Sequence, residues 1–98
     1  MLNQGDIIKV ENIKVPIFVA SKDFFNRTNE IIGCPIYNTG TEGPLHIKVS
    51  GRKRKGIVQC EKLALLDLNA RGYSVLDRCS ISDSMNVTDT IQGIFDYI

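Results

Sequence analysis

The sequence is poor in the residues that most often build metal or thiol sites. It has one histidine, no tryptophan and three cysteines in 98 residues. A two-histidine zinc motif is therefore impossible, and without a C-x-x-C pair a zinc ribbon or a thioredoxin-type site is excluded too. We expect no metal and no cofactor. The odd number of thiols, Cys34, Cys60 and Cys79, predicts free cysteines in a reducing, cytoplasmic compartment.

Net charge and long apolar runs are also missing. Twelve Lys and Arg residues nearly cancel eleven Asp and Glu residues, which gives a formal net charge of +1. No apolar run approaches the roughly 20 residues that cross a bilayer, so we expect no membrane partner. Residues 1–6 lack the basic and apolar regions of a secretory signal. The composition, 43% hydrophobic and 23% charged, is typical of one globular domain over residues 1–98.

Short apolar segments predict a sheet-rich fold. Strands are expected at residues 5–12, 15–20, 30–37, 45–49, 57–60 and 73–76. Residues 61–68 could form a helical turn or a strand, because their periodicity does not decide between the two. Gly33 and Pro35 predict a bulge or an edge position within the 30–37 strand. This close spacing favours a strongly curved antiparallel sheet or small barrel, α+β at the coarse level and mainly β.

Two segments predict helices. After the second strand, Ser21 is the expected N-cap of a short helix, and Phe24 and Phe25 are expected to point into the core. Near the C-terminus, Ser80 to Asp83 has the S-x-x-D form of a capping box. Apolar residues then recur at helical spacing: Val87, Ile91, Ile94, Phe95 and Ile98. We therefore expect an amphipathic C-terminal helix.

The strongest local signal is a run of cations between two glycines. Arg52, Lys53, Arg54 and Lys55 follow one another in what we call the basic turn, residues 50–56. At the tip of a hairpin, these cations would create a positive potential that attracts phosphates. They could equally form a solvated turn that protects an edge strand from aggregation.

Three further residues could carry function. Histidine is the side-chain type whose ordinary pKa lies near neutrality, so His46 could act as a general acid or base, or be an idle surface residue. Tyr37 and Asn38 begin the longest loop, residues 38–44, where binding residues tend to lie. Their alternative roles are packing and turn formation.

Several short motifs, in this order, carry a resemblance to a known family. They are G-D-I-I, V-P-I-F-V-A-S followed by F-N-R, C-P-I-Y, G-I-V-Q-C-E-K-L-A-L-L-D and A-R-G, and with the C-terminal segment they run from Gly5 to Phe95. This pattern resembles the MazF/PemK family, the toxins of type II toxin–antitoxin systems. The resemblance implies a curved antiparallel sheet of the CcdB/MazF/PemK type, an SH3-like barrel with short helices and a C-terminal helix. It also implies a homodimer, a cognate antitoxin partner and metal-independent cleavage of single-stranded RNA.

Two positions of the family pattern are changed. The family arginine before the strand-two proline is Val15 here, with Lys14 one position earlier, and the family threonine after P-[IV] is Tyr37. RNA cleavage through the 2′-hydroxyl needs a base, a positive charge and an acid. The hypothesis is that Glu61 serves as the base and His46 as the acid, while Lys14, or else Arg52 or Arg54, supplies the charge.

The RNA-binding residues are predicted separately from the catalytic ones. Tyr37 is of the type that stacks on an unpaired base. The predicted RNA-binding set is Tyr37, Asn38, Arg52, Lys53, Arg54 and Gln59. One alternative is a catalytically degenerate relative that binds nucleic acid or an antitoxin-like partner without cleavage. A third is a gyrase poison of the CcdB type, which shares the fold but uses a C-terminal tryptophan that this chain lacks.

Overall fold

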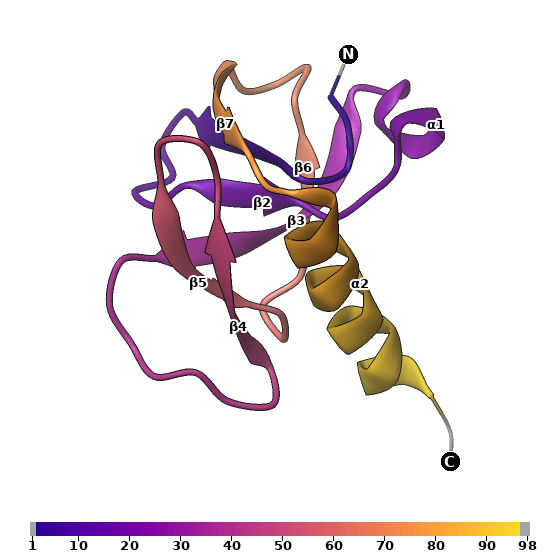
Figure 1. Cartoon of the computed structure of the whole chain (residues 1–98). Helices are drawn as coiled ribbons and strands as arrows, with labels where there is room; N and C mark the ends of the chain where they lie inside the picture. Colours follow the sequence, from indigo (N-terminus) through magenta and orange to yellow (C-terminus); the bar gives the residue numbers. More distant parts are fainter. Residues whose placement is uncertain (1, 97–98) are drawn as a thin grey trace.

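The computed structural model describes residues 2–96 of the chain. Within them lie seven strands and two helices (Figure 1). The strands are β1 (Asp6–Val10), β2 (Ile17–Val19), β3 (Glu30–Tyr37), β4 (His46–Ser50), β5 (Lys55–Gln59), β6 (Ala64–Asp67) and β7 (Tyr73–Arg78). The helices are α1 (Asp23–Asn26) and α2 (Ile81–Phe95). Residues 64–67 are thus a strand, which answers the question that periodicity left open.

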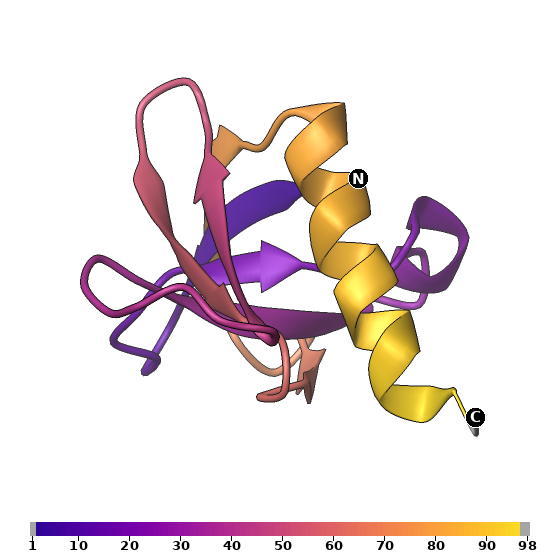
Figure 2. The same cartoon turned by 60° about the horizontal axis from the view of Figure 1, so that its bottom comes forward.

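The strands form a strongly curved antiparallel sheet. Its order is β4-β5-β3-β2-β1-β7, and β6 pairs with β3. Curvature brings the two ends of this path close together. As a result, Gly51 after β4 forms an isolated bridge with Cys79 after β7. In the described residues β4 and β7 do not pair along their lengths, so the sheet does not close into a barrel. Helix α2 lies alongside β4 in Figures 1 and 2. The predicted curved sheet with a C-terminal helix is confirmed.

Apolar side chains are buried on both faces of the central strands. On β2, Phe18 belongs to one core cluster, whereas Ile17 and Val19 belong to another. On β1, Ile7 and Ile8 divide between the same two clusters. Because neighbouring side chains point to opposite faces of a sheet, a continuous apolar run such as Ile17–Val19 fits a strand that is covered on both sides.

The expectation for Gly33 and Pro35 is wrong. Strand β3 runs without a bulge through both residues and lies in the middle of the sheet. The amide of Ile36 points toward the chain before β2, where it donates to Pro16 O. Successive backbone nitrogens of a strand point to opposite sides, so the nitrogen of Pro35 points away from β2. On that side β6 pairs as far as Gly33 and β5 pairs from Ile36 onwards. Proline therefore occupies the gap between two partners, where no amide is needed.

The N-cap expected for α1 is also wrong. The capping position is Lys22, and it makes no side-chain cap. Ser21 instead donates its hydroxyl to Asn26 Oδ1 over 2.6 Å and accepts the amide of Ile32 over 2.9 Å. Its hydroxyl thus joins β3 to the buried Asn26. The same packing leaves Phe24 69% exposed, contrary to expectation.

The C-terminal helix follows the sequence pattern in its first half. Ser80 is the N-cap, and its side chain accepts the amide of Asp83 over 3.1 Å. Val87 is fully buried, but Phe95 at the other end is 68% exposed. Ile98, the last member of the expected apolar stripe, lies outside the described residues. Within residues 2–96 no helix is both long and apolar enough to span a membrane.

Candidate functional site

The hairpin of β4 and β5 aligns several of the predicted site residues. His46 lies opposite Gln59, and Tyr37 on β3 lies opposite Ile57. Side chains alternate along a strand, so these four residues share a face that points away from the buried Val58. We call this the outer face of β3, β5 and β4. Directly opposed side chains lie about 5 Å apart at Cβ, so His46 and Gln59 are neighbours.

An acid–histidine pair is formed at the end of this face. Glu61 follows β5, and its Oε2 lies 2.9 Å from Nε2 of His46. Each side chain keeps about a third of its surface exposed, 35% for His46 and 38% for Glu61. The hydrogen bond from His46 lowers the pKa of Glu61, which is therefore ionised at neutral pH. An ionised carboxylate only accepts hydrogen bonds, so Nε2 carries a proton, and in the neutral ring Nδ1 is then an acceptor.

A cation lies close to this pair. Lys62 follows Glu61, and its Nζ lies 5.3 Å from the centre of the Tyr37 ring, within the range of a cation–π contact. Lys62 was not predicted from the sequence. Its position next to Glu61 was the only signal for it, because a lysine after a strand is more often a solvated residue.

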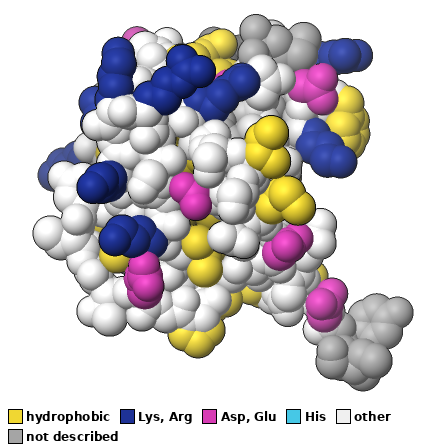
Figure 3. Space-filling view, in the orientation of Figure 1, with side chains coloured by type: hydrophobic (Ala, Val, Ile, Leu, Met, Phe, Trp, Pro, Cys, Tyr) yellow, Lys and Arg dark blue, Asp and Glu magenta, His cyan; other side chains and the backbone are white. Residues whose placement is uncertain are grey.

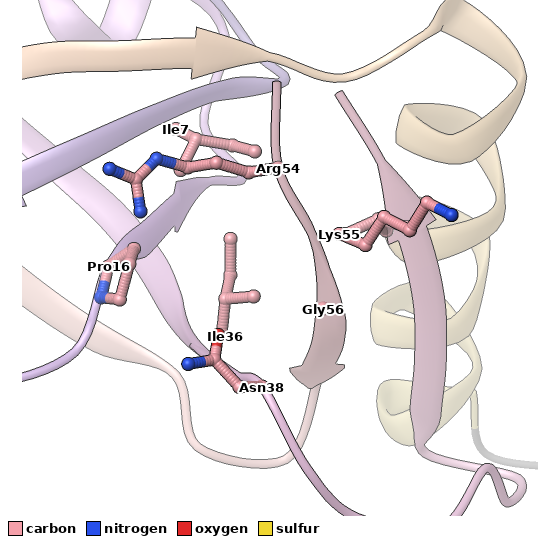
Figure 4. Close-up of a pocket in the computed structure, with 8 residues that line it drawn as sticks. Ile7, Pro16, Ile36, Asn38, Arg54, Lys55 and Gly56 are labelled. Atoms are coloured by element: carbon pink, nitrogen blue, oxygen red, sulfur yellow. The ribbon is translucent and has the colours of Figure 1, made fainter. Parts of the chain in front are cut away.

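A cavity lies on the other side of the same strands. Its volume is about 220 Å³, and its lining includes Asn38, Arg54, Lys55 and Pro16. Figure 4 shows the Arg54 guanidinium reaching toward Pro16, whereas the Lys55 ammonium points away from the cavity. Asn38 and Arg54, both of the predicted RNA-binding set, therefore meet here.

The two positions that depart from the MazF/PemK pattern lie on neighbouring segments of the chain. The register of β2 and β3 pairs Ile17 with Pro35, and the amide of Ile36 donates to Pro16 O over 2.9 Å. Val15 lies two residues before Ile17, and Tyr37 lies two residues after Pro35, so both follow the same end of the antiparallel β2–β3 pair. The positions where the family pattern has arginine and threonine thus lie toward the same end of this pair, and they hold an aliphatic and an aromatic residue here.

The remaining predicted residues lie elsewhere. Arg52 and Lys53 line a second cavity, of about 530 Å³, beside β7. Lys14 is exposed in the connection between β1 and β2, and neither Lys14 nor Gln59 lines the cavity that holds Arg54. The structure places His46, Glu61, Gln59 and Tyr37 on one face of the sheet. Lys14 neither lines the cavity that holds Arg54 nor takes part in the His46–Glu61 pair.

Two kinds of chemical site can be checked directly in the described part of the chain: metal-ligand clusters and cysteine thiols. Residues 2–96 contain no group of three or more His, Cys, Asp or Glu placed to hold a metal ion. The three cysteines are free and buried. Desolvation by burial raises the pKa of Cys34 and Cys79 to about 12 and that of Cys60 to about 11. Such thiols are weak nucleophiles at neutral pH.

Three solved structures share this fold and are distant from the chain in sequence. MazF in the MazE–MazF complex of Deinococcus radiodurans superposes with a TM-score of 0.83 at 18% identity, covering 95% of this chain and 94% of that one. An endoribonuclease from a mycobacterial species, in complex with its cognate antitoxin, gives 0.78 at 14% identity and covers all of both chains. The Mycobacterium tuberculosis toxin MazF-mt6 gives 0.71 at 15% identity, with 94% and 96% covered.

The sequence itself identifies the family. No curated protein is similar enough in sequence to count as a match. A family model for PemK-like, MazF-like toxins of type II toxin–antitoxin systems, however, matches residues 3–95. The matched segment includes all nine described strands and helices. The chain therefore belongs to the family of PemK-like, MazF-like toxins.

Proposed function

We propose that the protein is a toxin that cleaves single-stranded RNA without a metal ion, in the cytoplasm. The observation that carries this proposal is the pair of His46 and Glu61, 2.9 Å apart on the face that also bears Tyr37 and Gln59. Family membership supports the same activity. An aromatic ring beside polar side chains is the kind of surface that holds unpaired RNA bases.

We assign the pair roles that differ from those predicted from the sequence. Glu61 is a weak base because its hydrogen bond with His46 lowers its pKa. His46 Nδ1 is the better acceptor for the 2′-hydroxyl proton, and Glu61 holds the ring in the required tautomer. The 2′ oxygen then attacks the phosphorus, the bond to the 5′ oxygen breaks, and that oxygen takes a proton from water. Lys62 supplies the positive charge that Lys14 was expected to give.

Cleavage of a labelled single-stranded RNA in the presence of a chelator tests this proposal. Removing a general base typically lowers the rate about 10²- to 10⁴-fold, and we expect this for H46A. E61Q should retain partial activity, because an amide can still accept a hydrogen bond from Nε2. The matched control E42Q removes an exposed carboxylate in the 38–44 loop and should cut normally. RNA that is bound but left intact by the wild-type protein would favour the non-cleaving relative, to which the changes at Val15 and Tyr37 point.

We also propose that two copies associate through β7 and the start of α2. Ile81 and Met85 are 81% and 57% exposed and lie four residues apart on one helix face. Val75 on β7 is 56% exposed, and among the described strands β7 pairs only with β1. An uncovered edge strand with apolar neighbours is a typical interface. Analytical ultracentrifugation should show a dimer that I81D splits, whereas F24D, at an equally exposed site on α1, should not.

The partner that silences the toxin is proposed to be a cognate antitoxin protein. Two of the structural neighbours are complexes of this kind, one with MazE and one with a cognate antitoxin. The product of the adjacent reading frame should co-purify with this chain and protect RNA from it. A neighbouring product that neither binds the chain nor affects its activity would contradict this assignment.

A further inference from the structure

The backbone of the basic turn is bound by a carboxylate from β7. Asp77 Oδ2 accepts the amides of Lys53 and Arg54 over 2.8 and 2.9 Å, and Oδ1 accepts that of Arg52 over 3.0 Å. Oδ1 also accepts the amide of Arg78 over 2.8 Å. One carboxylate thus satisfies three successive amides of a turn that lies 23 to 25 residues earlier in the chain.

The other amides of residues 50–54 are bound as well. Asp83 Oδ2 accepts the amide of Ser50 over 2.8 Å, and Gly51 donates its amide to Arg54 O over 2.7 Å. A Cβ at Gly51 would collide with the carboxylate oxygens of Asp77, so glycine at this position permits the close approach of the carboxylate. The backbone of the turn is therefore fixed at every residue from 50 to 54.

Asp77 holds this backbone as an ionised group. Desolvation raises the pKa of Asp77, but hydrogen bonds from the amides of Lys53, Arg78, Arg52 and Arg54 together lower it by more, and the net shift is downward. The anion engages amides and leaves the basic side chains free. Within residues 2–96, none of the four cations at 52–55 forms a salt bridge. Lys and Arg side chains gather over the hairpin tip and the β7 edge, at the top and left of Figure 3.

We propose that Asp77 is a positioning residue for RNA binding, an inference that rests on the proposed function. Four consecutive cations repel one another, and a free turn would spread them over many conformations. Anchoring by Asp77 directs Arg54 into the cavity with Asn38, across β3 and β5 from the His46–Glu61 pair, and leaves Arg52 and Lys53 at the second cavity. The turn would therefore hold RNA on a surface separate from the cleavage site. Asp77 thereby preorganises the turn so that RNA phosphates meet charges already in place.

Charge alone predicts the opposite effect. Asp77 lies beside the cations, so removing its negative charge should strengthen attraction to RNA if it acts only through the electrostatic field. If it acts by positioning, D77N should weaken binding, because the amide group of asparagine turns a donor toward backbone donors. The two roles therefore predict opposite effects of D77N on RNA affinity.

The experiment measures the dissociation constant of a labelled single-stranded RNA over a range of salt concentrations. The proteins are wild type, D77N and the matched control D89N, which removes the same charge from an exposed position on α2. We expect D77N to bind about tenfold more weakly, as the loss of one charge-assisted hydrogen bond to RNA would give. Its salt slope should fall by about 0.7 for each RNA phosphate that the turn no longer neutralises. D89N should bind as tightly as wild type or slightly more tightly.

Two readouts, the salt slope and a double-mutant cycle with R54A, distinguish a positioning role of Asp77 from partial unfolding of the variant. A partly unfolded sample contains less binding-competent protein, but its folded molecules keep the wild-type salt slope. If Asp77 acts through Arg54, D77N should cost little once R54A is present, which a double-mutant cycle detects. Binding by D77N equal to or tighter than that of D89N overturns this inference alone. Absence of RNA binding by the wild type overturns it together with the proposed function.

Discussion

The buried amide of Asn26 offers a sharp test of how the F-N-R segment holds the fold. Asn26 is only 5% exposed, and its Nδ2 donates to Leu2 O over 2.9 Å and to Ser21 O over 3.0 Å. Its Oδ1 accepts the Ser21 hydroxyl over 2.6 Å. One side chain thus connects the N-terminal segment, the start of α1 and, through Ser21, strand β3.

N26D replaces this amide by a group of the same shape with no donor at neutral pH. The carbonyls of Leu2 and Ser21 then lose their donor and face a negative charge. Each unsatisfied buried group costs about 1–3 kcal/mol, so we expect a loss of about 4 kcal/mol in the free energy of unfolding. For a chain of this size that corresponds to a drop of about 15 °C or more in Tm.

The pH dependence gives this prediction a second check. Burial opposite two carbonyls raises the pKa of the introduced carboxyl in the folded state above its unfolded value of about 3.9. The folded state then binds the proton more tightly, so the variant loses stability as pH rises from the unfolded to the folded pKa. Below the unfolded value, the protonated acid can donate one hydrogen bond and part of the loss is recovered.

Thermal unfolding followed by circular dichroism at pH 7 and pH 3 measures both effects. N86D, at an exposed position of α2, introduces the same charge and serves as the control. It should melt within a few degrees of the wild type. A Tm for N26D equal to that of N86D at pH 7 would refute the structural role of the amide.

Four further predictions concern other contacts. G51A should lose about 2 kcal/mol in urea denaturation, because its Cβ displaces Asp77 from the amides; an unchanged midpoint would contradict this contact. S80A should lose about 1 kcal/mol in the same assay, since it removes the cap of α2, and a neutral effect would show that the cap carries no energy. The low pKa of Asp77 contributes stability above its unfolded pKa that is lost as pH falls through the folded value, so D77N should flatten the acid limb of the stability curve. Cys34 should resist alkylation at pH 8 unless urea is added, given its burial and its pKa of about 12; rapid labelling of native protein would contradict both.

Most elements were predictable because their signals are local. The apolar alternation of β4, the glycines around the basic turn and the Ser80 cap each lie within a few residues of the structure they specify. Pro35 shows where a local rule fails. Proline indicates a strand edge in general, but here a central strand changes partners at that residue, and only the positions of β5 and β6 reveal the gap.

The candidate site was harder to predict because it depends on register and curvature. His46 and Glu61 were both proposed from their chemistry, but their contact follows from the pairing of His46 with Gln59. Asp77 gave no signal, since its partners lie across a curved sheet whose shape no periodicity encodes. Lys14 was chosen because it lies one position before the family arginine, and closeness in sequence to Pro16 does not decide where a lysine side chain reaches.

The anchoring of the basic turn also bears on the order in which the protein is made. The two carboxylates that bind the turn lie 23 to 33 residues after their partners, so they leave the ribosome later. A nascent toxin can form the β4–β5 hairpin early, but its cationic tip has no fixed shape until β7 and the first turn of α2 exist. In pulsed hydrogen exchange during refolding, the amides of residues 52–54 should gain protection no earlier than those of α2. Under the proposed function, the cationic surface for RNA is therefore completed only after β7 and the start of α2 have been synthesised.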